Sequence, residues 1–186
     1  MNKLSLIFPA IVALLLAATA CDNDDNWNEY EDWRNTNEQW FQSQLNLQDA
    51  EGKLFYSRLA PEWDKSSYIL IHYFNDRQLT EGNLSPLYTS TVNVKYIGRL
   101  YNGEPFDSSF VSKTYGDSIF QTKLSDVISG WTIALEDMRV GDSVRVVIPY
   151  GLAYGGSSQG AILPYSTLQF DIKLTDIPYY EIPAGK

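Results

Sequence analysis

Apolar and polar side chains alternate along three segments in the second half of the chain, over residues 92–96, 144–148 and 168–174. A period of two places the apolar side chains of a strand on one face and the polar ones on the other. Asn102 and Gly103 form a dipeptide that favours a tight hairpin turn after the first of these segments. The pattern therefore predicts an antiparallel sheet with one apolar face.

Two earlier segments, residues 53–59 and 68–74, are also predicted to be strands. The second is apolar almost throughout, as expected for a strand covered on both faces. It contains His72, which we expect to be packed or hydrogen-bonded rather than catalytic. The polar residues 75–90, which include glycine, asparagine and proline, predict a loop.

One apolar stripe with helical spacing predicts a helix between the strands, at Val127, Ile128, Trp131, Leu135 and Met138. Ser125 or Asp126 can cap its start, and Gly141 is expected to stop it soon after its last turn. Strands around a single helix indicate an α+β domain, with a twisted antiparallel sheet wrapped around one short helix.

Residues 27–47 predict a further helix, because their aromatic and apolar side chains recur at spacings that suit one helical face. These side chains are Trp27, Tyr30, Trp33, Trp40, Phe41 and Leu45. We expect this N-terminal helix to pack on the domain that follows. A stripe that binds a partner is the alternative.

The first twenty residues have the pattern of a secretory signal peptide. Lys3 supplies the charged start, residues 4–16 are largely apolar, and residues 17–20 are small and end at Cys21. A cysteine in that position resembles the lipobox of bacterial lipoproteins. The resemblance implies that Cys21 carries a lipid and begins the mature protein, which would then hang from a membrane. An ordinary signal peptide followed by a chance cysteine is the alternative.

The composition restricts the possible chemistry. The 186 residues include 14 Lys and Arg against 23 Asp and Glu, a net charge of −9, which disfavours binding to nucleic acid. One histidine and one cysteine cannot build a zinc site of His and Cys ligands or an intrachain disulfide. We therefore expect no metal and no cofactor. No segment signals oligomerisation, and a monomer is expected.

Acidic residues are concentrated directly after Cys21, with nine of them in residues 22–51 and Arg34 as the single base there. This segment could simply be a solvated tether. An acidic run at this place also resembles the surface-export signal of Bacteroidota lipoproteins, whereas the enterobacterial sorting rule would read Asp22 as inner-membrane retention. We favour a lipid-anchored protein of the cell envelope, at the outer membrane or cell surface.

Four segments in order resemble an FKBP-type peptidyl-prolyl cis-trans isomerase domain over about residues 86–177. They are Val94-Lys-Tyr-Ile-Gly98, Gly103-Glu-Pro-Phe-Asp-Ser-Ser109, Val127-Ile-Ser-Gly-Trp131, and Ile148-Pro-Tyr-Gly-Leu-Ala-Tyr-Gly155 with Ile162-Leu-Pro164 and Leu168-Gln-Phe170. The resemblance implies a pocket between the sheet and the helix in which an X-Pro bond rotates without a nucleophile. The substrates would be unfolded or partly folded proteins of the cell envelope.

The resemblance also implies roles for individual residues. Aromatic walls and floor would come from Tyr96, Phe106, Trp131 and Phe170, with Trp131 beneath the proline ring. Val127 and Ile128 would line the rim, and the Ile128 backbone N–H would donate to a substrate carbonyl. Asp107 would face the pocket, Tyr154 would donate its hydroxyl to the substrate chain, and Ile162 and Leu163 would overhang the site.

One departure from the family pattern bears on activity. Counting back from Trp131, a second pocket aromatic falls at Ser118 or Ile119, so one wall of the pocket is expected to be altered. This departure keeps open a catalytically weak binding module on an envelope lipoprotein as the alternative function. A purely structural lipoprotein is a third possibility.

The expected organisation follows from these segments in chain order. It comprises a lipoprotein signal peptide (1–20), an acidic tether with the aromatic helix (21–52), extra strands and a loop (53–85), the isomerase domain (86–177) and a C-terminal tail (178–186).

Overall fold

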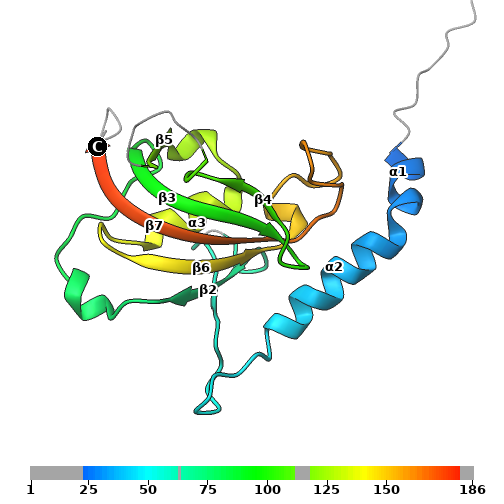
Figure 1. Ribbon diagram of the computed structural model, residues 1–186, viewed down its shortest axis with the longest axis horizontal. Coiled ribbons are helices and arrows are strands. Elements are labelled where there is room, and N and C mark those ends of the chain that lie inside the picture. Colours follow the sequence, from blue (N-terminus) through cyan, green and yellow to red (C-terminus); the bar gives the residue numbers. More distant parts are fainter. Residues whose placement is uncertain (1–22, 63, 112–117, 181–186) are drawn as a thin grey trace, which may run out of the picture.

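The computed structural model describes residues 23–62, 64–111 and 118–180, and an antiparallel sheet of seven strands dominates it (Figure 1). The strands are β1 (Ser57–Leu59), β2 (Ile69–Tyr73), β3 (Thr91–Leu100), β4 (Pro105–Ser108), β5 (Phe120–Lys123), β6 (Ser143–Ile148) and β7 (Leu168–Tyr179). Their order is β1-β2-β6-β7-β3-β4, and β5 pairs with the other end of β3. The α+β class predicted from the sequence is confirmed.

The long strand β3 shows why the alternating pattern is informative. Its even-numbered side chains from Val92 to Leu100 are buried, and the odd-numbered ones are partly exposed. The turn after β3 is the hairpin expected at Asn102-Gly103. Gly103 adopts a φ of +85°, a left-handed conformation that favours glycine, and its N–H donates to the Leu100 carbonyl (2.9 Å).

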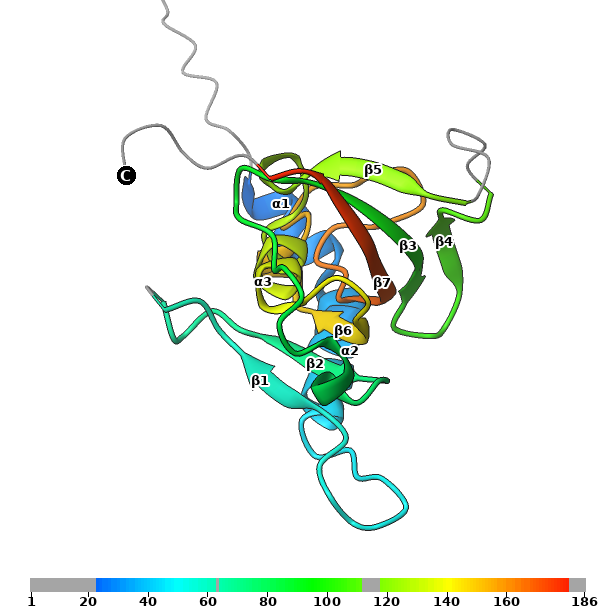
Figure 2. The same ribbon diagram turned by 90° about the vertical axis from the view of Figure 1, so that its left-hand side faces the viewer.

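The sheet curves around helix α3 (Ser129–Asp137), whose buried side chains include Trp131, Ile133 and Leu135 (Figure 2). The helix is therefore where the sequence places it, but its ends differ. Ser125 and Asp126 lie in a preceding 3-10 turn, η2 (Leu124–Asp126), and no side chain caps the first turn of α3. The helix stops at Met138, which is extended, three residues before Gly141.

Strand β2 is covered on both faces, as its apolar sequence predicts. Ile69 and Ile71 belong to the main core with α3, whereas Leu70 points to a second cluster with Phe41 and Val147. His72 is packed: its Nδ1 lies 2.7 Å from the Phe55 carbonyl oxygen, and its ring stacks on Phe55.

The predicted N-terminal helix is broken at Tyr30 into α1 (Asn23–Glu29) and α2 (Glu31–Gln44). It packs on the sheet side of the molecule, but not through the predicted aromatic face alone. The buried side chains of α2 are Arg34, Asn37 and Phe41. Arg34 stacks on Trp27 of α1 and lies near Tyr165, and Asn37 accepts a hydrogen bond from Thr167, so both polar side chains have partners in the interior.

Two other segments differ from expectation in extent. The strand predicted over 53–59 is shortened to β1, and the predicted loop 75–90 contains a 3-10 turn, η1 (Arg77–Thr80). The predicted signal peptide (1–20) and the predicted lipidation site Cys21 lie outside the described residues. Among the helices of the described part, none is long and apolar enough to cross a bilayer.

Candidate functional site

A cavity of about 330 Å³ opens between the sheet and the N-terminal end of α3. Strands β3, β4, β5 and β7 provide one side, the turn before α3 provides the rim, and the loop between β6 and β7 provides the remainder. The lining residues are Tyr96, Phe106, Asp107, Phe120, Asp126, Val127, Ile128, Trp131, Tyr154, Gln159 and Phe170. Its volume suits a small ring with its flanking peptide groups.

Aromatic rings packed edge to face form the wall of this cavity. Trp131 is only 4% exposed. Its ring centroid lies 5.0 Å from that of Tyr96 and 5.3 Å from that of Phe170, and both of these rings are nearly perpendicular to it. Phe106 packs against Phe170 in the same way at 5.6 Å. Such contacts fix the ring orientations, so the cavity is preformed and apolar at its base.

Gly98 makes this arrangement of rings possible. It lies on β3 opposite Phe170 and Asp107 in the register of the sheet. A Cβ atom at this position would come within 2.7 Å of Phe106 and 2.8 Å of Phe170. Glycine is therefore the residue that lets both rings approach the strand.

The carboxylate of Asp107 lies at the mouth of the cavity. The Tyr96 hydroxyl donates to Oδ2 of Asp107 (2.5 Å), and the Ser108 backbone N–H donates to its Oδ1 (2.7 Å). These two contacts hold the side chain in place while it remains exposed to the cavity and to solvent.

Two tyrosine hydroxyls at the site remain protonated near neutral pH. Burial, the hydrogen bond to Asp107 and the charge of Asp107 raise the pKa of Tyr96. Burial, and secondarily the charge of Asp107, raise the pKa of Tyr154. Tyr154 is 37% exposed, so its hydroxyl is accessible as a hydrogen-bond donor for a bound chain.

Eight of the ten site residues predicted from the sequence line this cavity, namely Tyr96, Phe106, Asp107, Val127, Ile128, Trp131, Tyr154 and Phe170. The other two do not. Ile162 is buried in the main core, because its segment turns inward, and Leu163 is 39% exposed away from the lining. The functional roles of the eight remain predictions, since the geometry shows where they lie and not what they bind.

The sequence holds no aromatic at Ser118 or Ile119, and the altered wall stays a prediction. Phe120, the first residue of β5, lines the cavity and packs edge to face on Tyr96 at 5.5 Å. Ser118 instead adopts a positive φ of 62° just before the strand. The pairing of Phe120 with Val94 on β3 supplies the position.

Two further polar residues line the cavity, Asp126 and Gln159, and the sequence predicts no role in the site for either. The sequence suggests Asp126 as a helix cap, but it lies on the rim next to Val127. Gln159 lies where its N–H donates to the Ile162 carbonyl (2.9 Å) in a narrow turn. Neither residue has a sequence signal of its own, because its place depends on how the loops fold.

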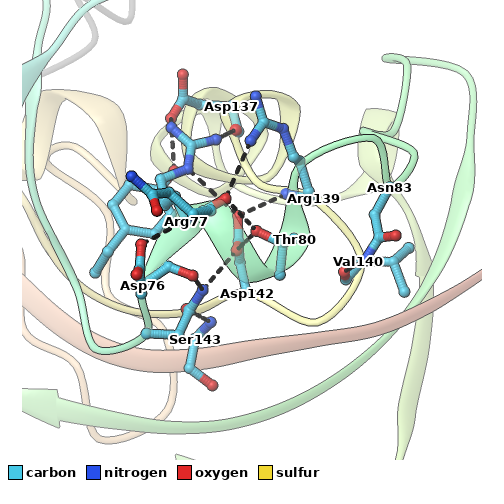
Figure 3. Close-up of polar contacts among 12 residues, drawn as sticks. Asp76, Arg77, Thr80, Asn83, Asp137, Arg139, Val140, Asp142 and Ser143 are labelled. Atoms are coloured by element: carbon cyan, nitrogen blue, oxygen red, sulfur yellow. Dashed lines mark hydrogen bonds and ion pairs between the residues drawn. The ribbon is translucent and has the colours of Figure 1, made fainter.

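A second polar cluster lies away from the cavity, where η1 meets the end of α3 (Figure 3). Asp142, whose side chain is fully buried, accepts hydrogen bonds from Thr80 (2.7 Å), Asn75 (2.9 Å) and the Arg139 N–H (2.9 Å). Burial opposes ionisation of Asp142, but these hydrogen bonds and the charge of Arg77 outweigh it and lower its pKa. Its donors surround it, so this cluster holds the loop and offers no open site.

Comparison with known proteins agrees with this geometry. The family model described as FKBP-type peptidyl-prolyl cis-trans isomerase matches residues 83–175. The macrophage infectivity potentiator of Trypanosoma cruzi is 36% identical over 71% of this chain and 66% of its own length. The isomerase FkpA of Escherichia coli is 40% identical over 69% of this chain and 46% of its own length. The chain thus spans between about half and two thirds of these two relatives.

Solved structures give the same result. The crystal structure of a peptidyl-prolyl cis-trans isomerase from Pseudomonas syringae covers 80% of this chain and 95% of its own, with 28% identity and a TM-score of 0.61. That of FkpA from Escherichia coli covers 84% of this chain and 64% of its own, with 25% identity and a TM-score of 0.66. The chain therefore belongs to the FKBP-type peptidyl-prolyl cis-trans isomerase family.

Proposed function

We propose that this protein catalyses cis-trans isomerisation of X-Pro peptide bonds in the cavity between the sheet and α3. The observation that carries the proposal is the preformed aromatic cavity with Trp131 at its base and Asp107 and Tyr154 at its mouth. The barrier to rotation is about 18–20 kcal/mol, because the planar peptide bond has partial double-bond character. The catalyst needs to favour a twisted amide over a planar one.

The lining residues supply that preference without forming a covalent bond. An apolar, water-poor wall disfavours the more polar planar amide relative to the twisted form. The Tyr154 hydroxyl and the Ile128 backbone N–H are the donors that would hold the chain on either side of the proline ring. Asp107 would act on the rotating carbonyl group through its charge.

Substrates of this activity would be unfolded or partly folded proteins with accessible X-Pro bonds. Uncatalysed isomerisation takes tens of seconds, so catalysis accelerates a slow folding step. A catalytically weak binding module was the alternative suggested by a missing wall residue. That alternative stays open, because Ser118 and Ile119 supply no aromatic side chain. The aromatic rings that do line the cavity favour catalysis.

We place the protein in the cell envelope on the sequence of its N-terminus. A lipid on Cys21 would anchor it, and the acidic residues that follow would separate the domain from an anionic membrane surface. The outer membrane or cell surface is the location we favour, and a monomer is the state we expect. Metabolic labelling with a fatty acid, compared with a Cys21→Ser variant, tests the anchor.

The activity is tested by following isomerisation of X-Pro peptides, with several residues before proline, by NMR exchange. The purified chain is expected to accelerate the exchange, and Tyr154→Phe is expected to lower kcat/KM by about tenfold, which corresponds to about 1.4 kcal/mol of transition-state stabilisation. Tyr179→Phe, a change at an exposed tyrosine remote from the cavity, is the matched control. No acceleration by the folded wild-type protein would contradict the proposal.

A further inference from the structure

The loop between β6 and β7 brings Tyr154 and Gln159 to the cavity, and helices α1 and α2 hold its middle and its end. Near the middle of the loop, the Asn26 side-chain amide donates to the Gly156 carbonyl (2.9 Å). At the last part, the Trp33 indole N–H donates to the Ser166 hydroxyl (3.0 Å). In Figure 1 the N-terminal helices run directly beside this loop.

A third hydrogen bond completes the attachment at the end of the loop. The Asn37 side-chain carbonyl accepts from the Thr167 N–H (2.9 Å). Asn37 is fully buried and Thr167 is 1% exposed, so this contact is shielded from water. Thr167, the residue directly before β7, is thus fixed to α2 through a side chain.

Tyr165 lies near the end of the loop and joins the helices to Gly155 in its middle. Its ring packs edge to face on Trp27 of α1 at 5.2 Å and on Tyr150 at 5.5 Å. Its backbone N–H donates to the Gly155 carbonyl (2.8 Å), directly after Tyr154. Tyr165 has a positive φ of 60°, a strained conformation for a non-glycine residue, so its surroundings must hold it there.

Arg34 orients Trp27, the ring that packs on Tyr165. The side chain is 6% exposed, and its guanidinium carbon lies 3.4 Å from the ring centre of Trp27 and 5.7 Å from that of Tyr165. Its Nη1 also donates to the Trp27 carbonyl (2.7 Å). A buried guanidinium stacked on one ring and close to a second orients both, which lysine cannot reproduce.

We propose that α1 and α2 are part of the catalytic apparatus, and that Arg34 and Asn26 are positioning residues that hold Tyr154 at the mouth of the cavity. The inference rests on the proposed isomerase activity. Neither residue lines the cavity, so both act through the loop: Arg34 through Trp27 and Tyr165, and Asn26 through Gly156. A hydrogen-bond donor displaced by even about 1 Å loses much of its effect on a transition state.

The experiment is a double-mutant cycle on the full chain, with kcat/KM for X-Pro isomerisation as the readout. Arg34→Met is expected to lower kcat/KM on the order of tenfold. In a Tyr154→Phe background the same change is expected to have little further effect, because its route to the substrate is already removed. Arg34→Lys should restore activity only in part. Gln39→Ala, on the exposed side of α2, is the matched control and should leave kcat/KM unchanged.

Hydrogen exchange separates this inference from the isomerase proposal. Arg34→Met should speed exchange of the Gly155 and Ser157 amides, which bond within the loop, while the Val146 amide in β6 stays protected. If the wild-type protein is inactive, the isomerase proposal fails and exchange alone decides whether Arg34 orders the loop. If Arg34→Met does not fold, Asn26→Ala, which removes one hydrogen bond, takes its place in both measurements.

Two results would overturn the inference. The first is a loss of kcat/KM that is as large in the Tyr154→Phe background as in the wild type, since Arg34 would then not act through Tyr154. The second is unchanged exchange of the Gly155 and Ser157 amides in a folded Arg34→Met or Asn26→Ala variant.

Discussion

Two tyrosine–carboxylate pairs in this protein have the same geometry and different surroundings. Tyr96 donates to Asp107 at 2.5 Å, and Tyr73 donates to Asp137 at 2.5 Å. The second pair also contacts Arg77, whose Nη1 lies 3.2 Å from Asp137 and whose guanidinium carbon lies 4.3 Å from the ring centre of Tyr73. The first pair lies among aromatic rings at an open cavity.

The difference between the pairs lies in the third partner. Arg77 balances the charge of Asp137 and joins it to the buried Asp142 cluster, so this pair completes a structural network (Figure 3). Within the part of the chain that the structure describes, the ion pairs involve Asp137, Asp142 and Asp171, and Asp107 is in none of them. A charge that faces an apolar cavity is available to a bound substrate.

The largest expected effect comes from breaking the structural network at its centre. Asp142→Ala should lower the free energy of unfolding by about 3 kcal/mol, because it leaves several buried donors without an acceptor. Urea unfolding measures this loss. The folded fraction should retain wild-type kcat/KM. A stability change below about 1 kcal/mol would show that the cluster contributes little to holding the loop.

A second change gives Asp107 the kind of neighbour that Asp137 has. Gln159 lines the same cavity as Asp107, so Gln159→Arg places a cation near this carboxylate. We expect kcat/KM to fall on the order of tenfold, with partial recovery in high salt as the new charge is screened. Gln159→Ala is the matched control and should have a smaller effect that does not depend on salt. Unchanged activity in Gln159→Arg would show that a cation near Asp107 does not impair catalysis.

Removing one hydroxyl from each pair compares them directly. Tyr73→Phe and Tyr96→Phe should each lower the free energy of unfolding by about 1.5 kcal/mol, the lower end of the range for a hydrogen bond to a charged group. Only Tyr96→Phe should also lower kcat/KM, because only its partner faces the cavity. An equal effect of both variants on kcat/KM would contradict the separation of the two pairs.

The smallest effect is a dependence of stability on acid pH. Hydrogen bonds and arginine charges outweigh burial and lower the pKa values of Asp142 and Asp171 from the usual 3.8. A carboxylate with a lowered pKa stabilises the fold above its unfolded pKa, and this contribution is lost as the pH falls through the folded value. Stability should therefore decline below about pH 4, by at most about 1.4 kcal/mol per pH unit for each group.

Replacing either carboxylate with an amide tests that assignment. Asp142→Asn and Asp171→Asn should each be less stable than the wild type at pH 7 and should show a flatter decline in acid, as followed by thermal unfolding between pH 2 and pH 7. A decline as steep as in the wild type would assign the acid sensitivity to other carboxylates.

The sequence predicted the parts of the molecule that have a period. Strands β3, β6 and β7 and helix α3 follow from alternating or helical spacing, because burial of one face imposes that spacing. The resemblance placed eight of its ten site residues around one cavity for a related reason, since they lie on these elements or directly beside them.

The parts that escaped prediction depend on contacts between distant residues. Phe120 joins the site through the pairing of β5 with β3. The burial of Arg34 and Asn37 depends on Trp27, Tyr165 and Thr167, and polar residues on a helix give no periodic signal of burial. The Asp142 cluster joins residues more than 60 positions apart. The sequence therefore gives no sign that its charged side chains are buried together.

The most direct test compares two matched variants, Asp107→Asn and Asp137→Asn, by NMR exchange of an X-Pro peptide with the full chain. We predict that the wild type accelerates exchange, that Asp107→Asn loses at least tenfold in kcat/KM, and that Asp137→Asn keeps wild-type activity with a modest loss of stability. Equal activity of the two variants, whether both active or both inactive while folded, would contradict the assignment of Asp107 to catalysis and of Asp137 to structure.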